Sequence, residues 1–306
     1  MTDAIVLEGV RKAFGSKVAV RDLDLVVPGG SLYGFIGPNG AGKTTTIRMI
    51  MSILFPDAGR VEVLGRPTAL DAKDRIGYLP EERGVYRKMR VGSFLRYIGH
   101  LKGAAEGGDV RRWLERVGLA EVEKKRCEEL SKGMQQKIQF IASVIHEPDL
   151  LILDEPFSGL DPLNMRLLRE LILEEHQRGA TIIFSTHVMH QAEQLCDHIV
   201  MIHDGDKVLD DSLAQIRARQ DPRLILLEPV DSQADATATL QAVPRVRGVR
   251  RSDRRYEIGL DEGAEPQQVM RDLITAVPPA RIELHRPTLE DVFVGLAGAP
   301  IEEVGA

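Results

Sequence analysis

The sequence predicts an α/β protein with a helical insertion, followed by a small α+β domain. Three short apolar runs are typical of buried parallel strands: DLLILDEP, ATIIFSTH and HIVMIHDG. The stretches between them, MRLLRELILEEHQ and MHQAEQLC, have helical character. Beyond about Asp210 the amino-acid composition changes: residues 221–306 contain arginine but no lysine.

The first 80 residues alternate strand-like runs with Gly and Pro, and they contain one strongly helical stretch, KTTTIRMIMSIL at 43–54. The strand-like runs are IVLEGV, VAVRDLDLVV, SLYGFIG, RVEVLG and DRIGYLP. From Val91 to His146 the pattern is helical, with charged residues among the apolar ones. We therefore expect an insertion of helices at about 85–148.

The C-terminal segment predicts a domain of its own, at 219–306 after a first domain at 1–218. Its pattern is strand, helix, two strands around Val246 and Tyr256, helix, strand and a last helix. That last helix opens on Pro287, Thr288 and Asp291, which fit a capping box.

Composition narrows the class of protein. The chain has 306 residues, 43% of them hydrophobic, which suits a globular protein with a real core. Its formal charge of -6 argues against a general nucleic-acid binder. No window approaches 18 uninterrupted apolar residues and no basic leader is visible, so we expect a cytoplasmic chain without a membrane span. Cys127 and Cys196 lack metal-ligand spacing and are expected to be reduced structural thiols.

The stretch GPNGAGKT fits the phosphate-binding pattern G-x-x-x-x-G-K-[ST], and it lies between a predicted strand and a predicted helix. Small residues let successive backbone N–H groups surround phosphates, and the helix N-terminus favours the anion. Lys43 would reach the β and γ phosphates and the Thr44 hydroxyl would contact Mg²⁺. The expected ATP-binding loop is Gly37, Pro38, Asn39, Gly40, Ala41, Gly42, Lys43, Thr44 and Thr45.

The run LLILDEP places two adjacent carboxylates at the C-terminal end of a strand, where open α/β sheets hold their ligands. Asp154 is the expected partner of Mg²⁺, and Glu155 can orient or deprotonate an attacking water. A solvated strand end is the alternative interpretation, which the neighbouring phosphate loop disfavours.

With GPNGAGKT, LSKGMQQK, LLILDEPFSGLDP and STH in this order, the chain resembles the ATP-binding subunit of an ABC transporter over about residues 3–215. The resemblance implies a P-loop NTPase core of the ABC type, with an antiparallel β subdomain and a helical subdomain. The middle motif YLPEERG and the late segment PTLEDVF resemble the subset that serves ABC-2-type exporters, including sodium-efflux and drug-export cassettes.

In that family two cassettes pack head to tail, and ATP on one phosphate loop is covered by the LSGGQ motif of the other. LSKGM stands at that position here, which implies that Ser131 and Gly133 meet the γ-phosphate of the partner's ATP. Gly133 otherwise costs about 1 kcal/mol in a helix. The alternative is that Ser131 is only a helix N-cap. Lys132 and Met134 depart from the family pattern. Lys132 would either strengthen ATP-dependent closure or point to solvent, and solvent is favoured because a long side chain is costly to immobilise.

A second departure is Glu81, which follows the proline where most relatives have glutamine. The family's glutamine approaches Mg²⁺ through its carbonyl oxygen, and a carboxylate can also bind this metal. An ionised Glu81 cannot donate a hydrogen bond, so this loop cannot sense the γ-phosphate through a donor at this position. The alternative places Glu81 in an acidic surface loop.

Three further residues complete the expected site by resemblance. His187, in STH, would contact the γ-phosphate and hold Glu155 and the water. Asp161, in SGLDP, would bridge the two cassettes and is also a plausible N-cap before Pro162. Phe14 would stack on adenine, unless it is a core residue.

The expected protein is an ATPase that uses ATP and Mg²⁺, with Glu155, His187 and Lys43 as its catalytic residues. Its expected partners are a second copy or a paralogous cassette, and an ABC-2-type permease that holds it at the inner face of the membrane; nucleic acid is not expected. The alternative is a regulatory ATPase of the same fold that acts on ribosomes or DNA. The sequence leaves open the cargo and the role of the arginine cluster around Arg250, for which a solvated hairpin face is favoured.

Overall fold

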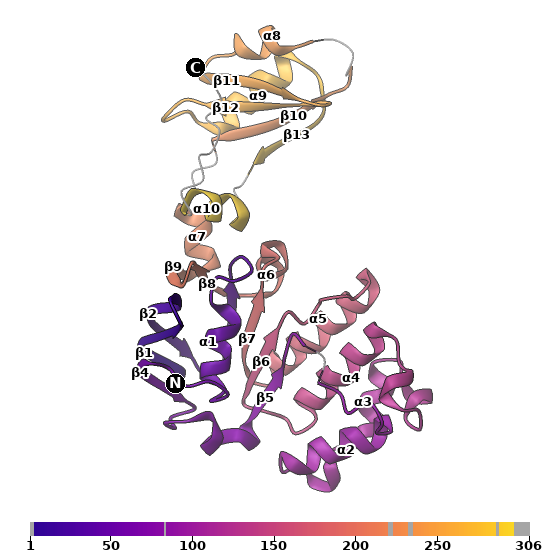
Figure 1. The fold of residues 1–306 in the computed structure, drawn as a ribbon. Coiled ribbons are helices and arrows are strands. Elements are labelled where there is room, and N and C mark those ends of the chain that lie inside the picture. The colour runs from indigo at the N-terminus through magenta and orange to yellow at the C-terminus, as the bar shows by residue number, and fades with distance from the viewer. Residues whose placement is uncertain (1–2, 83, 220–222, 232–234, 286–287, 297–306) are drawn as a thin grey trace. The chain divides into compact units, whose positions relative to one another are not determined.

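The computed structural model describes residues 3–82, 84–219, 223–231, 235–285 and 288–296. The chain divides into two compact units, Met1–Leu213 and Ala214–Ala306 (Figure 1). Helix α7 (Leu213–Arg219) contains the position 218/219 that the sequence suggests as a domain boundary.

A six-stranded sheet with the order β5-β6-β7-β3-β8-β9 forms the centre of the first unit (Figure 1). The first five strands are parallel, and β9 pairs antiparallel with β8. Every residue of β3, β6 and β7 is buried, as expected of strands covered on both faces. The strands are β3 (Leu32–Ile36), β5 (Ile76–Leu79), β6 (Leu150–Asp154), β7 (Thr181–Thr186), β8 (His198–His203) and β9 (Asp206–Ser212).

The N-terminal strands form a separate antiparallel sheet with the order β2-β1-β4, from β1 (Asp3–Phe14), β2 (Lys17–Pro28) and β4 (Ala58–Val63). Its buried face shares one hydrophobic cluster with helix α1 (Lys43–Ile50) and with residues of the large sheet. Helix α1 is shorter than the expected 43–54. It ends because Ser52 adopts a left-handed φ of 54°, and the N–H groups of Ile53 and Leu54 both turn to the Arg48 carbonyl.

The expected helical insertion consists of three helices that pack against one another: α2 (Val91–Leu101), α3 (Val110–Arg116) and α4 (Lys132–Val144) (Figure 1). The ring of Trp113 on α3 meets the buried ring of Phe140 on α4 edge to face, with centroids 6.4 Å apart. Short 3₁₀ turns connect the elements: η1 (Ala69–Arg75), η2 (Ala105–Gly107), η3 (Ala120–Val122) and η4 (Cys127–Glu129). Helices α5 (Pro162–Gln177) and α6 (Met189–Leu195) connect β6, β7 and β8.

The second unit is built on a four-stranded antiparallel sheet with the order β11-β12-β10-β13. Its strands are β10 (Leu224–Pro229), β11 (Val246–Ser252), β12 (Arg255–Leu260) and β13 (Pro279–His285). The core joins this sheet to α8 (Thr237–Gln241) and α9 (Pro266–Ala276) through buried residues that include Ile225, Tyr256 and Leu273. The unit therefore has the α+β character that the sequence predicts.

The last helix, α10 (Leu289–Leu296), begins with the predicted capping box. The Thr288 N–H donates to the Asp291 carboxylate at 2.7 Å, and the Asp291 N–H donates to the Thr288 hydroxyl at 3.2 Å. Pro287, which the prediction also included, lies outside the described residues.

Two smaller expectations, on the cysteines and on the arginine cluster, are also met. Both cysteines are free and buried. The arginines of the cluster are all exposed, on the hairpin β11–β12 or beside it: Arg245, Arg247, Arg250, Arg251, Arg254 and Arg255. In the part of the chain that the structure describes, no helix is both long and apolar enough to cross a membrane.

Candidate functional site: a phosphate-binding cleft

The phosphate loop joins the end of β3 to the start of α1 and forms one wall of a cleft of about 390 Å³. Because β3, β6 and β7 are parallel, their C-terminal ends meet at one edge of the sheet, and the cleft lies at that edge. The lining residues come from segments far apart in the sequence: Phe14, Lys17, Ala19, Asn39, Gly40, Gly42, Lys43, Thr44, Thr45, Glu81, Asp154 and Glu155.

Two glycines of this loop are required by its conformation. Gly37 has a φ of 152°, and a Cβ there would lie 2.1 Å from the carbonyl oxygen of Ile202. Gly42 has a φ of 114°, and its Cβ would lie 2.4 Å from the carbonyl oxygen of Ala19. Both contacts are with backbone atoms, which have no room to move aside, so the loop keeps this tight turn only with glycine.

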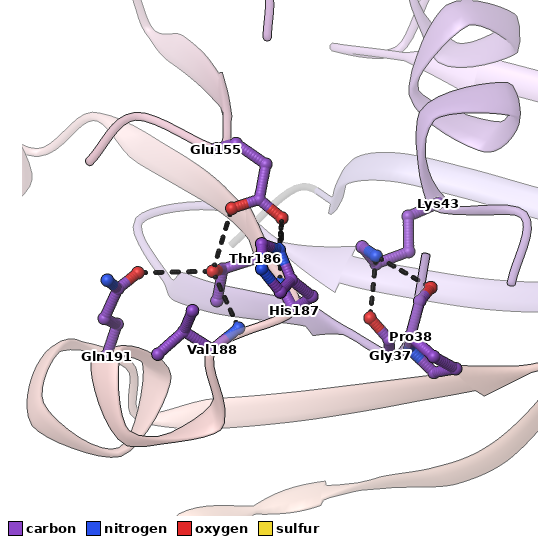
Figure 2. A network of polar contacts seen from close by, with 8 residues as sticks. All are labelled: Gly37, Pro38, Lys43, Glu155, Thr186, His187, Val188 and Gln191. Carbon is purple, nitrogen blue, oxygen red and sulfur yellow. Dashed lines mark hydrogen bonds and ion pairs between the residues drawn. The ribbon is translucent and has the colours of Figure 1, made fainter. Parts of the chain in front are cut away.

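Lys43 lies folded over its own loop. Its Nζ donates to the carbonyl oxygens of Gly37 at 2.7 Å and Pro38 at 3.1 Å (Figure 2). The side chain is almost wholly buried, and this burial lowers its pKa, while Glu155 and Asp154 act in the opposite direction. Lys43 thus places a positive charge at the floor of a loop whose shape suits phosphate.

Asp154 ends strand β6 and is buried beside the cleft. Neither of its carboxylate oxygens, nor the neighbouring Ser185 hydroxyl, makes a hydrogen bond of normal geometry to a described residue. Burial raises the pKa of Asp154, and the hydroxyls of Ser185 and Thr44 act in the opposite direction. Since buried polar atoms without partners are rare, this carboxylate marks a place where a further ligand fits.

Glu155 has a left-handed backbone, with a φ of 50°, and its N–H donates to the Ser185 carbonyl at 2.9 Å. This turn aims the side chain at the end of strand β7, where three donors converge on its carboxylate (Figure 2). The main-chain N–H of His187 lies 2.9 Å from Oε1, and the Nδ1 of the same residue lies 2.6 Å from it. The Thr186 hydroxyl lies 3.2 Å from Oε2. Non-glycine residues with such backbone strain are concentrated at functional sites.

Ser131, Gly133 and Asp161 are not among the residues that line this cleft. Ser131 caps α4, accepting from the Met134 N–H at 3.3 Å, and Lys132 is exposed. Asp161 caps α5, accepting from the Asn164 N–H at 3.0 Å, with Pro162 in the first turn as expected.

Gly133 has no structural reason to be glycine within its own chain. Its φ is not left-handed, and a Cβ there would have only ordinary van der Waals contact, 3.6 Å from a methyl group of Leu160. Alanine is the better helix former, by about 1 kcal/mol in a helix interior, so helix propensity does not favour glycine here. The fold of the single chain therefore does not require glycine at this position.

Two residues that line the cleft were not predicted from the sequence, and two predicted residues, Phe14 and Glu81, do line it. Lys17 and Ala19 come from the start of β2, and no motif marks them. Phe14 is 53% exposed, so it is not a core residue, and it lines the cleft. Glu81 also lines the cleft, although it is exposed.

Comparison with known proteins agrees with this geometry. The ABC transporter family model matches residues 20–158, and a model described as the C-terminal domain of DrrA1-3-like ATP-binding proteins matches residues 212–297. Over 97% of this chain, an uncharacterized ABC transporter ATP-binding protein of Bacillus subtilis, YhaQ, is 38% identical, and all of that protein is covered.

Two further proteins of the same class, the ATP-binding subunits of ABC transporters, are similar to this chain. The Nod factor export ATP-binding protein I of a Rhizobium species is 32% identical over 98% of this chain and 99% of its own length. A solved structure of the ATP-binding subunit of an ABC transporter is 31% identical, covers 71% of this chain and 92% of its own, and superposes with a TM-score of 0.66.

The chain belongs to the ABC transporter ATP-binding proteins. Members of this family are ATPases that work with membrane permeases and typically dimerise, so the protein binds and hydrolyses ATP as a transporter subunit. These similarities favour the transporter over the regulatory ATPase of ribosomes or DNA that the sequence left as an alternative.

Proposed function

We propose that two copies of this chain, or this chain and a paralogous cassette, enclose two ATP molecules and drive an export permease by closing and opening. Gly133 carries the proposal, because its own fold leaves room for a side chain that a partner's phosphate would exclude. Ser131 and the N-terminus of α4 would then contact the γ-phosphate of ATP held by the other copy. Asp161, near the start of α5, would bridge the two copies.

We assign the chemistry to the residues gathered at the cleft. Water attacks the γ-phosphorus in line, the bond to the β–γ bridging oxygen breaks, and ADP and phosphate are released. Glu155 orients this water and accepts its proton, and His187 holds Glu155 and contacts the γ-phosphate. Lys43 leaves the carbonyl groups of its own loop to bind the phosphates, and Phe14 stacks on adenine.

The donor set at the cleft also fits Mg²⁺. Among the described residues, no group of three His, Cys, Asp or Glu side chains forms a metal site of its own. Mg²⁺ bound to nucleotides needs fewer protein ligands, because phosphate and water supply the others. Asp154, with its unpartnered oxygens, would hold the ion with Thr44 and Glu81, and the ion would neutralise charge on the phosphates.

An ABC-2-type permease is the proposed membrane partner, and it would hold the chain at the inner face of the membrane. Support comes from exposed aromatic residues that follow the loop at Glu81. Tyr86 is 52% exposed and Tyr97 43% exposed, and their rings pack edge to face 5.9 Å apart. Large exposed apolar groups that lie together are typical of protein contacts. The name of the Nod factor export protein supports the outward direction of transport.

The variant Glu155→Gln tests the proposal. It should still bind ATP, because the phosphate loop is intact, but its turnover should fall by at least about 100-fold, and ATP-bound dimer should accumulate. ATPase rate, nucleotide affinity and size-exclusion profile measure the three effects. Glu121→Gln, at an exposed position in η3, is the matched control and should behave as wild type. Full turnover in Glu155→Gln would refute the assignment.

A further inference from the structure

Thr186 lies at the centre of the polar network beside the cleft (Figure 2). It is the last residue of β7, and its side chain is fully buried. Its hydroxyl oxygen lies 3.2 Å from Oε2 of Glu155 and 3.2 Å from the side-chain amide oxygen of Gln191 on α6. The same oxygen accepts the N–H of Val188 at 3.1 Å.

The number of protons in this network limits how it can be arranged. A threonine hydroxyl has one proton, so it cannot donate to Glu155 and to a Gln191 oxygen at once. An ionised carboxylate can only accept, whereas the amide of Gln191 can present either its oxygen or its nitrogen. With the nitrogen turned inward, Gln191 and Val188 both donate to the hydroxyl oxygen, and the Thr186 proton is left for Glu155.

The two oxygens of the Glu155 carboxylate accept different numbers of hydrogen bonds. Oε1 receives two donors from His187, one of them the main-chain N–H. Oε2 receives only the Thr186 hydroxyl among the hydrogen bonds described. The side chain of His187 is 48% exposed, whereas Thr186 is buried in a strand, so Thr186 is the more rigid side-chain anchor. Without it, the carboxylate is held at Oε1 alone, so its plane is less firmly fixed.

We propose that Thr186 is a positioning residue that fixes the carboxylate plane of Glu155 for attack of water, and that Gln191 orients the Thr186 hydroxyl. The proposal rests on the proposed role of Glu155 in hydrolysis. Thr186 acts through Glu155 and not on ATP itself. Loss of the Thr186 hydroxyl should therefore slow the chemical step and leave the affinity for ATP unchanged.

A purely structural role of Thr186 would have different effects on stability and turnover. The contact with the Val188 N–H also stabilises the turn that leads into α6, as threonine hydroxyls often do near helix starts. If that were the only role of Thr186, its replacement would lower the stability of the fold. ATP affinity and turnover would then change together, with no special dependence on Glu155.

Kinetics of the purified full-length chain test the proposal. Thr186→Val keeps the shape but removes the hydroxyl, and we expect kcat to fall about 10- to 100-fold, as for other residues that orient a catalytic group, with KM for ATP within about twofold. Thr186→Ser keeps the hydroxyl and should restore most of kcat. Gln191→Leu removes the amide at a partly exposed position and should give an intermediate loss.

A double variant separates this proposal from the one it rests on. In a Glu155→Gln background, Thr186→Val should cause no further loss, because the group it positions is gone. If Glu155→Gln is inactive while Thr186→Val keeps full turnover, the positioning role is wrong and the role of Glu155 stands. If Glu155→Gln keeps full turnover, both proposals fail. A loss in Thr186→Val that serine does not restore, together with a raised KM, would also overturn the positioning role.

Discussion

The Nδ1 of His187 lies 2.6 Å from Oε1 of Glu155, and the main-chain N–H of the same histidine reaches that oxygen at 2.9 Å. Because an ionised carboxylate only accepts, the ring must carry its proton on Nδ1. A neutral imidazole has no second N–H, so His187 can donate to Glu155 or to a phosphate oxygen, and it can donate to both only as imidazolium. The main-chain donor keeps Glu155 in place in either state.

Replacement by alanine should have different effects at Gly40 and at Gly37, two glycines of the phosphate loop. Gly40 has a φ of 82° with no atom within 4 Å of a Cβ, so Gly40→Ala should cost only the left-handed strain, about 1–2 kcal/mol. Gly37→Ala adds a contact of 2.1 Å with the Ile202 carbonyl, so it should cost more stability and also weaken ATP binding. Urea unfolding and nucleotide titration measure both effects.

Gly263→Ala provides the control for this comparison. Gly263 lies in the second unit with a φ of 72° and open space around its Cβ, so it reports the left-handed strain alone. Equal losses of stability in Gly37→Ala and Gly263→Ala would show that the contact with Ile202 does not constrain the loop.

His146 should make the first unit less stable in mild acid. Burial, helped by the charge of Lys102, lowers the pKa of His146 from 6.5 to about 4. Between these two values the unfolded chain binds a proton that the folded chain does not, so stability rises with pH in this window and is lost as pH falls through it. The loss is at most about 3.5 kcal/mol, at about 1.4 kcal/mol for each pH unit.

The variant His146→Gln isolates this effect, because glutamine stays neutral and can still donate to the Ile76 carbonyl that lies 3.2 Å from Nε2. Its stability should fall less steeply than that of the wild type between pH 6.5 and 4, and the two slopes should agree above pH 6.5. Parallel curves across the whole range would contradict the lowered pKa. Urea unfolding at several pH values gives the comparison.

The sequence predicted those parts of the fold and site that are encoded locally. The loop at Gly37 lies between a strand and a helix as its spacing required, and Asp161 caps α5 next to Pro162. The end of α1 at Ile50 could not be predicted, because KTTTIRMIMSIL has no residue that breaks a helix. At the turn, Ser52 has a left-handed φ and its hydroxyl accepts the Ala69 N–H at 3.0 Å, a contact between residues distant in the sequence.

The missed residues have no pattern of their own. Thr186 belongs to the quoted STH stretch, yet only the fold brings its hydroxyl between Glu155 and Gln191. Lys17 reaches the cleft only because β2 passes beside the phosphate loop. In the same way, the glycine at position 133 raised a question that the sequence alone could not answer, since whether its Cβ has room depends on Leu160, far along the chain.

The claim that each ATP site is shared between two copies can be tested by complementation. Lys43→Ala disables the phosphate loop and keeps the α4 start intact, and Gly133→Arg does the reverse. With either variant alone, both sites of any dimer are damaged, so each variant should be nearly inactive. In a mixed dimer, the intact loop of one copy meets the intact Gly133 of the other, so one complete site is restored.

ATPase activity on mixing equal amounts of the two purified variants is therefore the most direct measurement. The shared site predicts recovery to about one quarter of the wild-type rate, because about half of the dimers are mixed and each of these has one complete site. If mixing gave no more than the sum of the two separate rates while mixed dimers were demonstrably present, or if Gly133→Arg alone kept full activity, the shared site would be wrong.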